Sequence, residues 1–137
     1  MSSTTELAAS TSKLELPTIQ ESQEANLAEV GQLGMSQDGA SAAAFFGNGF
    51  RYRHDWGKLK GQQILPLNWG LITPNSLVFV AIGEGVSPNT AAGKKIGEAR
   101  YTLHNVSPEN GVVKIWVNIE WQHSLIRLYA DYFVFNP

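Results

Sequence analysis

The C-terminal stretch 111–137 reads GVVKIWVNIEWQHSLIRLYADYFVFNP. Two runs of alternating apolar and polar residues flank a short polar segment at 122–124. Alternation with a period of two is typical of a β-strand with one buried face, because successive side chains point to opposite sides. We therefore expect two long strands here, and we expect them to determine how the core is built.

Each run has one face that is almost entirely apolar. The residues on these faces are Val113, Ile115, Val117, Ile119 and Trp121 in the first run, and Ile126, Leu128, Ala130, Tyr132 and Val134 in the second. If His123 and Ser124 form a turn, an antiparallel hairpin puts Trp121 opposite Ile126 and brings both apolar faces to the same side. A slip of one residue would pair core positions with solvent positions. The expectation is a C-terminal β-hairpin.

The same register collects aromatic and charged side chains on the second face. The candidate interface or ligand-binding residues on this face are Trp116, Asn118, Arg127, Tyr129, Asp131 and Phe133. Large exposed apolar patches are uncommon on monomers. We therefore expect one of two arrangements: the chain's own N-terminal residues or loops cover this face, or the face contacts another subunit or a ligand. Trp, Tyr and Arg are enriched at such interfaces. Asn118 and Asp131 beside Trp116 also suggest a sugar-binding platform.

The rest of the chain after residue 45 also shows the sequence patterns of β-strands. SLVFVAI (76–82) is a short apolar run, which predicts a central strand covered on both faces. EARYTLH (98–104) alternates, which predicts a half-exposed strand. RYRHDW (51–56) and QQILPL (62–67) are candidate edge strands, since Pro66 has no backbone donor.

Turn sequences separate these strands, and together they define the fold class. TPNS (73–76), SPNT (87–90) and SPENG (107–111) each place Pro early in a reversal that Asn or Gly follows. We expect five to seven strands between residues 45 and 137. The prediction is an all-β, antiparallel β-sandwich, with a jelly roll as the second choice.

Residues 1–44 form a polar arm of different composition. The arm is rich in Ser, Thr, Ala, Gln and Glu and has no aromatic residue, as in segments that cannot bury enough surface to order themselves. Thr18 and Glu21 have capping-box spacing, and Leu27 and Val30 share a side, which predicts a short helix within the arm. Two interpretations of the arm remain open: a flexible or partly helical tail, and a segment that docks on a neighbouring surface.

Charge and hydropathy exclude several partners. Residues 1–50 carry one basic and six acidic side chains, and residues 51–137 carry nine basic and six acidic ones. An acidic arm cannot neutralise phosphates, so we expect no direct nucleic-acid binding. No apolar stretch reaches the roughly 18 residues of a membrane span, and the N-terminus lacks a secretory signal pattern. These patterns leave the location undetermined, with the cytoplasm as the fallback expectation.

Catalytic and metal-binding patterns are absent from the sequence. There is no cysteine, and His54, His104 and His123 lack the spacing of metal ligands and are expected at the surface or in turns. His54 and Asp55 point in opposite directions on an extended strand, which argues against a catalytic dyad. TAAGKKIG (90–97) has Lys95 where a phosphate-binding loop needs Ser or Thr. We expect no enzyme activity, no catalytic residues, no metal and no cofactor.

A polar arm that precedes a small β body with strands such as VVKIWVNIEW (112–121) and LYADYFVF (128–135) resembles the layout of small viral coat and virion-surface proteins. The resemblance implies a self-assembling structural protein located in a virion, as a homo-oligomer or part of a shell. Two features differ from that family: arms that contact genomes are usually basic, and a capsid jelly roll sends its last two strands to different sheets. The expected function is non-enzymatic assembly through the arm and the aromatic face, and the alternative is a carbohydrate-binding lectin.

Overall fold

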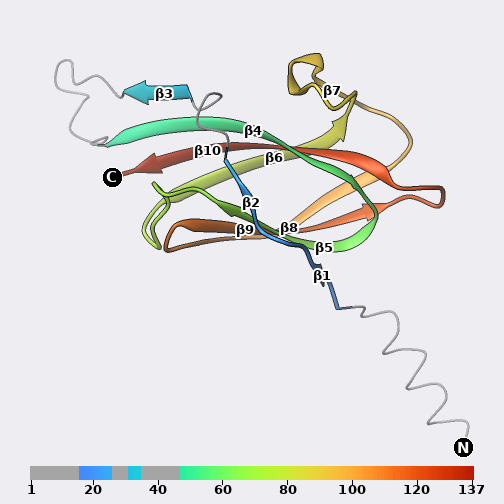
Figure 1. The fold of residues 1–137 in the computed structure, drawn as a ribbon, viewed down its shortest axis with the longest axis horizontal. Coiled ribbons are helices and arrows are strands. Elements are labelled where there is room, and N and C mark those ends of the chain that lie inside the picture. Colours follow the sequence, from blue (N-terminus) through green and yellow to red (C-terminus); the bar gives the residue numbers. More distant parts are fainter. Residues whose placement is uncertain (1–15, 26–30, 35–46) are drawn as a thin grey trace, which may run out of the picture.

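The computed structural model describes residues 16–25, 31–34 and 47–137, and it consists of two curled, mostly antiparallel sheets packed face to face (Figure 1). We call them the β9 sheet and the β10 sheet after their central strands. The β9 sheet contains β1 (Thr18–Ile19), β2 (Gln23–Glu24), β5 (Gly61–Asn68), β9 (Val112–Glu120) and β8 (Arg100–Glu109). The β10 sheet contains β3 (Gly31–Gly34), β4 (Asn48–Leu59), β10 (Ile126–Asn136), β6 (Leu77–Gly85) and β7 (Lys94–Lys95). The predicted all-β sandwich is confirmed.

The predicted C-terminal hairpin is wrong, because β9 and β10 lie in different sheets. β9 pairs with β5 and β8, whereas β10 pairs with β4 and β6. The link 121–125 crosses the roughly 10 Å between packed sheets. Strands in opposite layers of a sandwich also turn their apolar faces toward each other, so the alternating pattern fits both arrangements equally well.

The long strands pair in a nested order. β4 pairs with β10, which is the last strand, and β5 pairs with β9, which is the second last. In a rolled-up hairpin, the first long strand pairs with the last one, and the second long strand pairs with the second last one. The long strands here have this arrangement. The placement of β9 and β10 in different sheets removes the topological objection to the jelly roll, the second fold that the sequence suggests.

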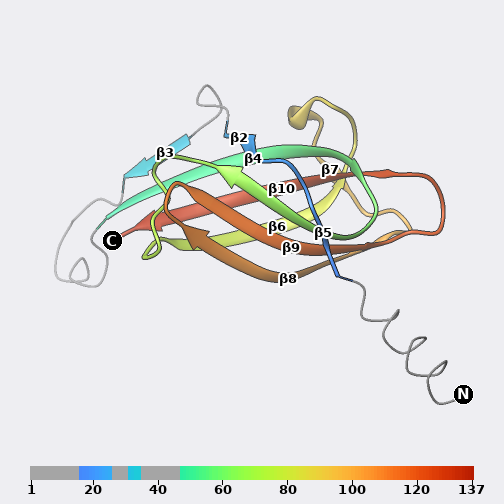
Figure 2. The ribbon, with the colours of Figure 1, turned by 60° about the horizontal axis from the view of Figure 1, so that its bottom comes forward.

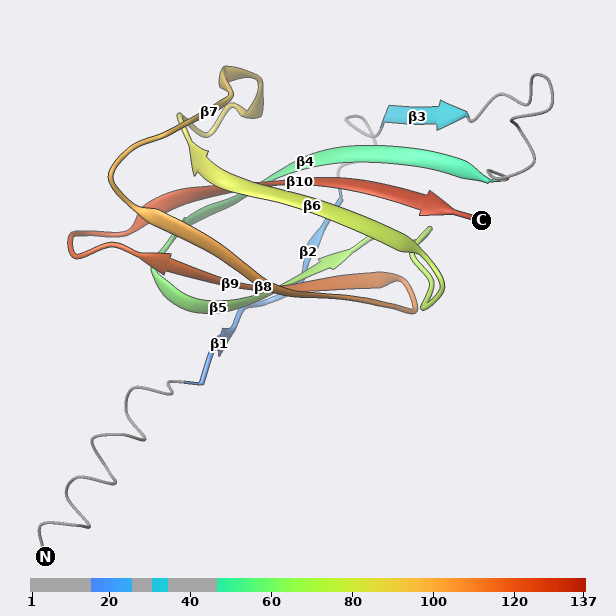
Figure 3. The ribbon, with the colours of Figure 1, turned by 180° about the vertical axis from the view of Figure 1, so that it is seen from behind.

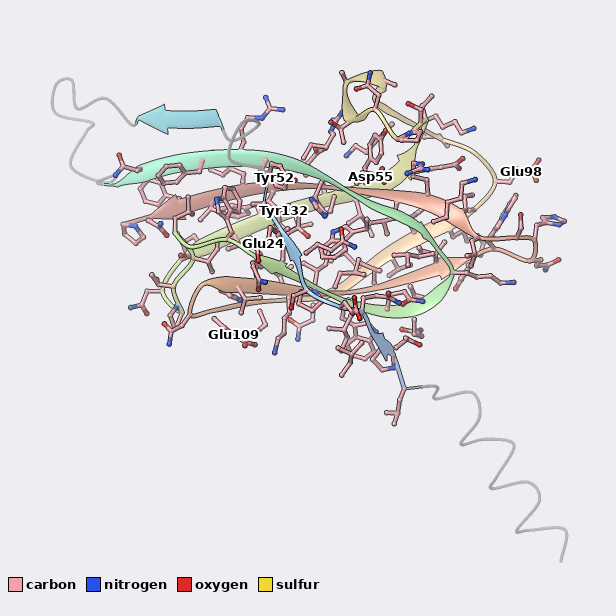
Figure 4. All side chains as sticks on the ribbon, in the orientation of Figure 1. Glu24, Tyr52, Asp55, Glu98, Glu109 and Tyr132 are labelled. Carbon is pink, nitrogen blue, oxygen red and sulfur yellow. The ribbon has the colours of Figure 1, made fainter. Side chains whose placement is uncertain are left out.

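The core lies between the two sheets and contains the predicted apolar faces. Val113, Ile115, Val117, Ile119, Leu128, Ala130, Tyr132 and Val134 are buried, and Trp121 and Ile126 pack against them. Figure 4 shows Tyr52 and Tyr132 between the sheets. Trp56 donates a hydrogen bond from Nε1 to the Tyr132 hydroxyl over 3.0 Å. Burial raises the pKa of Tyr132, so this hydroxyl stays neutral and acts as a hydrogen-bonding group.

Strand β6 differs from the predicted central strand covered on both faces. It pairs with β10 on one side, and only Glu84 and Gly85 pair with β7 on the other. Val78, Val80 and Ile82 are partly buried against the core, but Leu77 is 52 % exposed and Phe79 is 63 % exposed. β6 is therefore largely an edge strand with an apolar outer face.

Strand β8 has the half-exposed pattern that the sequence predicts. Tyr101 and Leu103 are partly buried against the core, while Arg100, Thr102 and His104 are exposed. The Tyr101 hydroxyl donates to the carbonyl oxygen of Arg127 over 2.9 Å, which ties the β9 sheet to the β10 sheet. Burial raises the pKa of Tyr101.

The predicted turns bend the chain where expected. The Ser76 N–H donates to the Thr73 carbonyl over 3.0 Å, closing the turn before β6. Asn89 caps a short 3₁₀ turn, η3 (Thr90–Ala92), by accepting a hydrogen bond from the Ala91 N–H. Gly111, with φ of 72°, lies in the tight turn between β8 and β9, where glycine adopts the left-handed region at no steric cost.

Two segments of the predicted arm run along β5 as strands, so the predicted helix is wrong for residues 18–25 (Figure 2). β1 pairs with β5 as far as Ile64, and β2 resumes the pairing at Leu67. The interruption coincides with Pro66, which has no N–H to offer. Leu27 and Val30, the other two residues of the helix prediction, lie outside the described residues.

Candidate interaction surface

The predicted candidate residues do not share one face. Trp116 and Asn118 lie on the outer face of the β9 sheet, while Arg127, Tyr129, Asp131 and Phe133 belong to the outer face of the β10 sheet. This separation follows directly from the placement of β9 and β10 in opposite layers. A sugar platform that combines Trp116 and Asn118 with Asp131 is therefore wrong.

Asp131 is at the centre of an ion-pair cluster on the β10 sheet. The carboxylate accepts Arg53 Nε at 2.5 Å and Nη2 at 3.1 Å, a bidentate contact, and it pairs with Lys94 Nζ at 2.7 Å. Burial alone would raise the pKa of Asp131, but hydrogen bonds from Arg53 and Lys94 and their charges outweigh it and lower the pKa. Asp131 is therefore ionised, and its carboxylate is already paired with Arg53 and Lys94.

A second ion pair lies further along the same face. Arg127 Nη1 contacts Asp55 Oδ2 at 2.5 Å, and both side chains are mostly shielded. His54, the neighbour of Asp55 in sequence, is buried at 8 % exposure, so the two side chains point to opposite faces as the alternation predicts. This separation supports the argument against a His–Asp dyad.

Tyr129 is buried, although it is on the outer face of β10. Its hydroxyl donates to the Asn89 carbonyl at 2.9 Å and also contacts the Ser87 carbonyl. The segment between β6 and β7 therefore covers the ring. Gly85 lies directly under it, because a Cβ at this position would be 2.3 Å from a ring carbon of Tyr129. Of the two arrangements expected from the sequence, cover by a loop of the chain itself is the one found at Tyr129.

Beyond this covered region, the outer face is apolar and exposed. Leu77 and Phe79 are more than half exposed, and the Phe79 ring is 6.4 Å from that of Phe133, which is partly buried. We call these three residues the Phe79 patch. A shallow hollow of about 350 Å³ adjoins it and is lined by Arg51, Phe79, Val80, Ala81, Asp131, Tyr132 and Phe133. Sequence reasoning missed Leu77 and Phe79, because a short apolar run does not reveal which of its faces is uncovered.

On the opposite side of the molecule, Trp116 is 36 % exposed. Its Nε1 donates to Gln62 Oε1 over 2.7 Å, and its ring centre is 5.0 Å from that of His104. Asn118 is partly buried on the same face. These polar neighbours make this face more hydrophilic than the Phe79 patch.

A row of hydrogen-bonded polar side chains leads into the sandwich where β2 crosses from β5 toward β4. His54 Nδ1 is 2.7 Å from the Tyr52 hydroxyl, and His54 Nε2 is 2.7 Å from Gln23 Oε1. Burial lowers the pKa of His54 from 6.5 to about 4, more than the nearby Asp55 charge raises it. A neutral ring that accepts from Tyr52 and donates to Gln23 satisfies both contacts. The expectation of a surface histidine is wrong for His54.

At the end of the sandwich where the link 121–125 crosses between the sheets, there is an open hollow of about 460 Å³. Its lining combines rings with charged and amide groups: Glu98, Arg100, Glu120, Trp121, Gln122 and His123. The Trp121 and His123 rings meet edge to face, with centres 4.8 Å apart. Planar rings beside carboxylate and amide groups can bind polar ring-shaped molecules by stacking and hydrogen bonds.

Within the described part of the chain, no three His, Cys, Asp or Glu side chains come together as metal ligands would. None of the described helices is long and apolar enough to cross a membrane. No protein-family model, curated protein or solved structure matches the chain.

Proposed function

We propose that this chain is a non-enzymatic structural protein that assembles with copies of itself through the outer face of the β10 sheet. The observation that carries the proposal is the Phe79 patch, where Leu77 and Phe79 are 52 % and 63 % exposed beside Phe133. Contiguous apolar surface of this kind marks contact sites, because leaving it in water is costly. The ion pairs of Asp131 lie beside the patch as a polar rim.

The polar arm is the second expected contact. It is acidic, whereas residues 51–137 carry a small excess of basic side chains, so the arm of one copy is electrostatically suited to the body of another. A viral coat or virion-surface component is the narrower form of this proposal. The nested strand order and the arm preceding the β body support that narrower form.

The test measures molar mass by light scattering during size-exclusion chromatography over a range of protein concentrations. We expect the wild-type chain to form a defined oligomer and Phe79→Ser to shift it toward the monomer. Leu125→Ser is the matched control, since Leu125 is 57 % exposed but lies in the link between β9 and β10. A wild-type chain that stays monomeric at every concentration would refute the proposal.

The second candidate function is that of a carbohydrate-binding lectin, and the hollow around Trp121 favours it. A sugar ring could stack on Trp121 while Glu120 and Gln122 bind its hydroxyl groups. A glycan array tests this function independently of oligomer mass. Binding that Glu120→Gln and Gln122→Ala abolish would support the lectin, and an array without a signal would exclude it.

A further inference from the structure

Two long edge strands, β6 and β8, lie at the same side of the sandwich (Figure 3). Unpaired strand edges expose rows of backbone donors and acceptors, and proteins usually protect them from pairing with other chains. β8 carries such protection: its register shifts between Leu103 and Asn105, Pro108 lies within it, and Arg100 and Glu109 charge its ends. These features make β8 a poor partner for another strand.

The sequence of β6 provides no comparable protection, although β8 of the other sheet lies close beside it. From Leu77 to Gly83 it contains only apolar residues and glycine, with no charge and no proline, and its register with β10 is continuous. β7 covers the edge only at Glu84 and Gly85. In the described part of the chain, the stretch 77–83 therefore has a strand partner on one side alone.

We propose that β6 pairs antiparallel with β6 of a second copy, about a two-fold axis at Val80, so that the β10 sheets of two copies become one continuous sheet. This inference rests on the proposed self-assembly and adds an edge contact to the contact through the outer face, because pairing in the plane of the sheet leaves the Phe79 patch uncovered. The free stretch begins at Leu77 and ends where β7 begins to pair, and its midpoint is Val80. Antiparallel pairing of this stretch with itself uses its whole length only when Val80 faces Val80.

The resulting register is complementary on both faces of the sheet. On the outer face, Phe79 faces Ala81 of the second copy, so a large side chain meets a small one, and Leu77 faces Gly83, over which the Lys94 side chain lies. On the inner face, Val78 faces Ile82, and both are apolar. The axis cannot move to Ala81, because β7 occupies that end and Val78 would face the Glu84 carboxylate.

The same symmetry also places the two ends of β8. Tyr101 bonds to the carbonyl of Arg127, next to the pairing of β10 with Glu84, so the Arg100 end of β8 lies beside the Glu84 end of β6. Glu98 and Glu109 lie at opposite ends of the sandwich (Figure 4). A two-fold axis perpendicular to the sheet therefore directs the Arg100 end of one β8 toward the Glu109 end of the other, while Arg100 and Glu109 keep their own partners, Glu120 and Lys114.

Cysteine cross-linking tests the register directly, since the chain has no cysteine. Directly opposed residues of an antiparallel pair have Cα atoms roughly 4.5–5.5 Å apart, which is within disulfide reach. Under mild oxidation, Val80→Cys should become a covalent dimer. Val78→Cys is the matched control on the same strand and face: it should stay uncross-linked alone and cross-link when mixed with Ile82→Cys.

Each outcome distinguishes the edge pairing from the broader assembly. If the wild-type chain assembles but Val80→Cys cross-links no faster than Val78→Cys, the edge pairing is wrong and assembly stands. If deletion of residues 1–44 abolishes assembly and exposes the β6 edge, the arm of a second copy occupies it, and the inference also fails. A wild-type chain that is monomeric throughout would overturn both proposals.

Hydrogen–deuterium exchange provides a readout that does not depend on a cysteine variant folding. In the wild-type chain, backbone amides between Leu77 and Gly83 should exchange more slowly at concentrations where the oligomer forms. The β8 amides on the far side from β9 provide the internal comparison. Equal exchange of 77–83 in monomer and oligomer would contradict the edge pairing.

Discussion

At the scale of single residues, His54 links the charge state of one ring to the stability of the whole sandwich. The ring is buried between Tyr52 and Gln23, with the Trp56 ring edge-on at 4.7 Å and Asp55 as the nearby charge. Burial lowers the pKa of His54 from 6.5 to about 4. The folded state therefore requires a neutral ring, whereas the unfolded chain binds a proton below pH 6.5.

The sign of the pH dependence follows from this difference. Above pH 6.5 the His54 ring is neutral in both states, and lowering the pH from 6.5 toward 4 stabilises only the unfolded chain. We expect the free energy of unfolding to fall by about 3 kcal/mol across this window. Urea midpoints from pH 7.5 to 4 measure it, and His54→Gln should flatten the profile. His104→Gln, at an exposed ring, should leave it unchanged.

Gly85 is a second single residue with a measurable role, because Tyr129 packs directly on it. A Cβ at Gly85 would be 2.3 Å from the ring, so Gly85→Ala must displace Tyr129 or the strand. We expect a loss of about 1–3 kcal/mol in the free energy of unfolding, as in other overpacked sites. Gly70→Ala is the control, since nothing lies within 4 Å of a Cβ there. Equal denaturant midpoints for both variants would show that the Tyr129 site is loosely packed.

At the scale of elements, the faces of β9 and β10 are predictable from alternation, but their neighbours are not. Val117 and Leu128 are buried as predicted, because burial depends on which face is apolar. The pairing partners of β9 and β10 depend on the other strands of the chain. A hairpin of β9 with β10 and a placement of the two in opposite sheets would bury the same faces. The Phe79 patch was not predicted for a related reason: the sequence of β6 does not show that, among the described strands, only β10 and a short β7 pair with it.

The segment that contains β1 and β2 is an element whose contribution was not predictable from composition. Thr18 to Ala25 are polar or small for the most part, yet their backbone pairs with β5, and Gln20 donates to the buried Gln63 over 2.7 Å. Asn68 also donates to Glu24 over 3.0 Å. Backbone pairing and a few specific side-chain bonds place this segment, and neither leaves an apolar pattern in the sequence.

Two truncations test this element. A chain that begins at Asn26 loses both short strands and the contact of Gln23 with His54, so its free energy of unfolding should fall by about 1–3 kcal/mol. Its stability should also depend less on pH between 6.5 and 4, because water can then reach His54. A chain that begins at Leu16 is the control. Identical midpoints and pH profiles for the two truncated chains would show that β1 and β2 contribute nothing to stability.

At the scale of the whole molecule, the proposed self-assembly would be coupled to folding by mass action. A partner that binds only the folded chain stabilises it, and the stabilisation grows with concentration. The Phe79 patch and the free edge of β6 belong to the folded sandwich alone, since both require β6 to lie beside β10. Under the proposed self-assembly, stability measured at one concentration therefore combines the strength of the core with the strength of the contact between copies.

Varying the concentration separates these two contributions. If two copies pair, each tenfold rise in protein concentration should increase the free energy of unfolding by about 1.4 kcal/mol per dimer. Phe79→Ser should remove this dependence while keeping the stability that the wild type has when dilute, because Phe79 is 63 % exposed in the single chain. Ile119→Ala should do the reverse, since Ile119 is buried in the core: it lowers stability by about 2–5 kcal/mol at every concentration and preserves the slope. Denaturant midpoints of the three chains over a hundredfold range of concentration measure all of these effects. A wild-type midpoint that does not change with concentration would mean that the patch has no second copy as its partner.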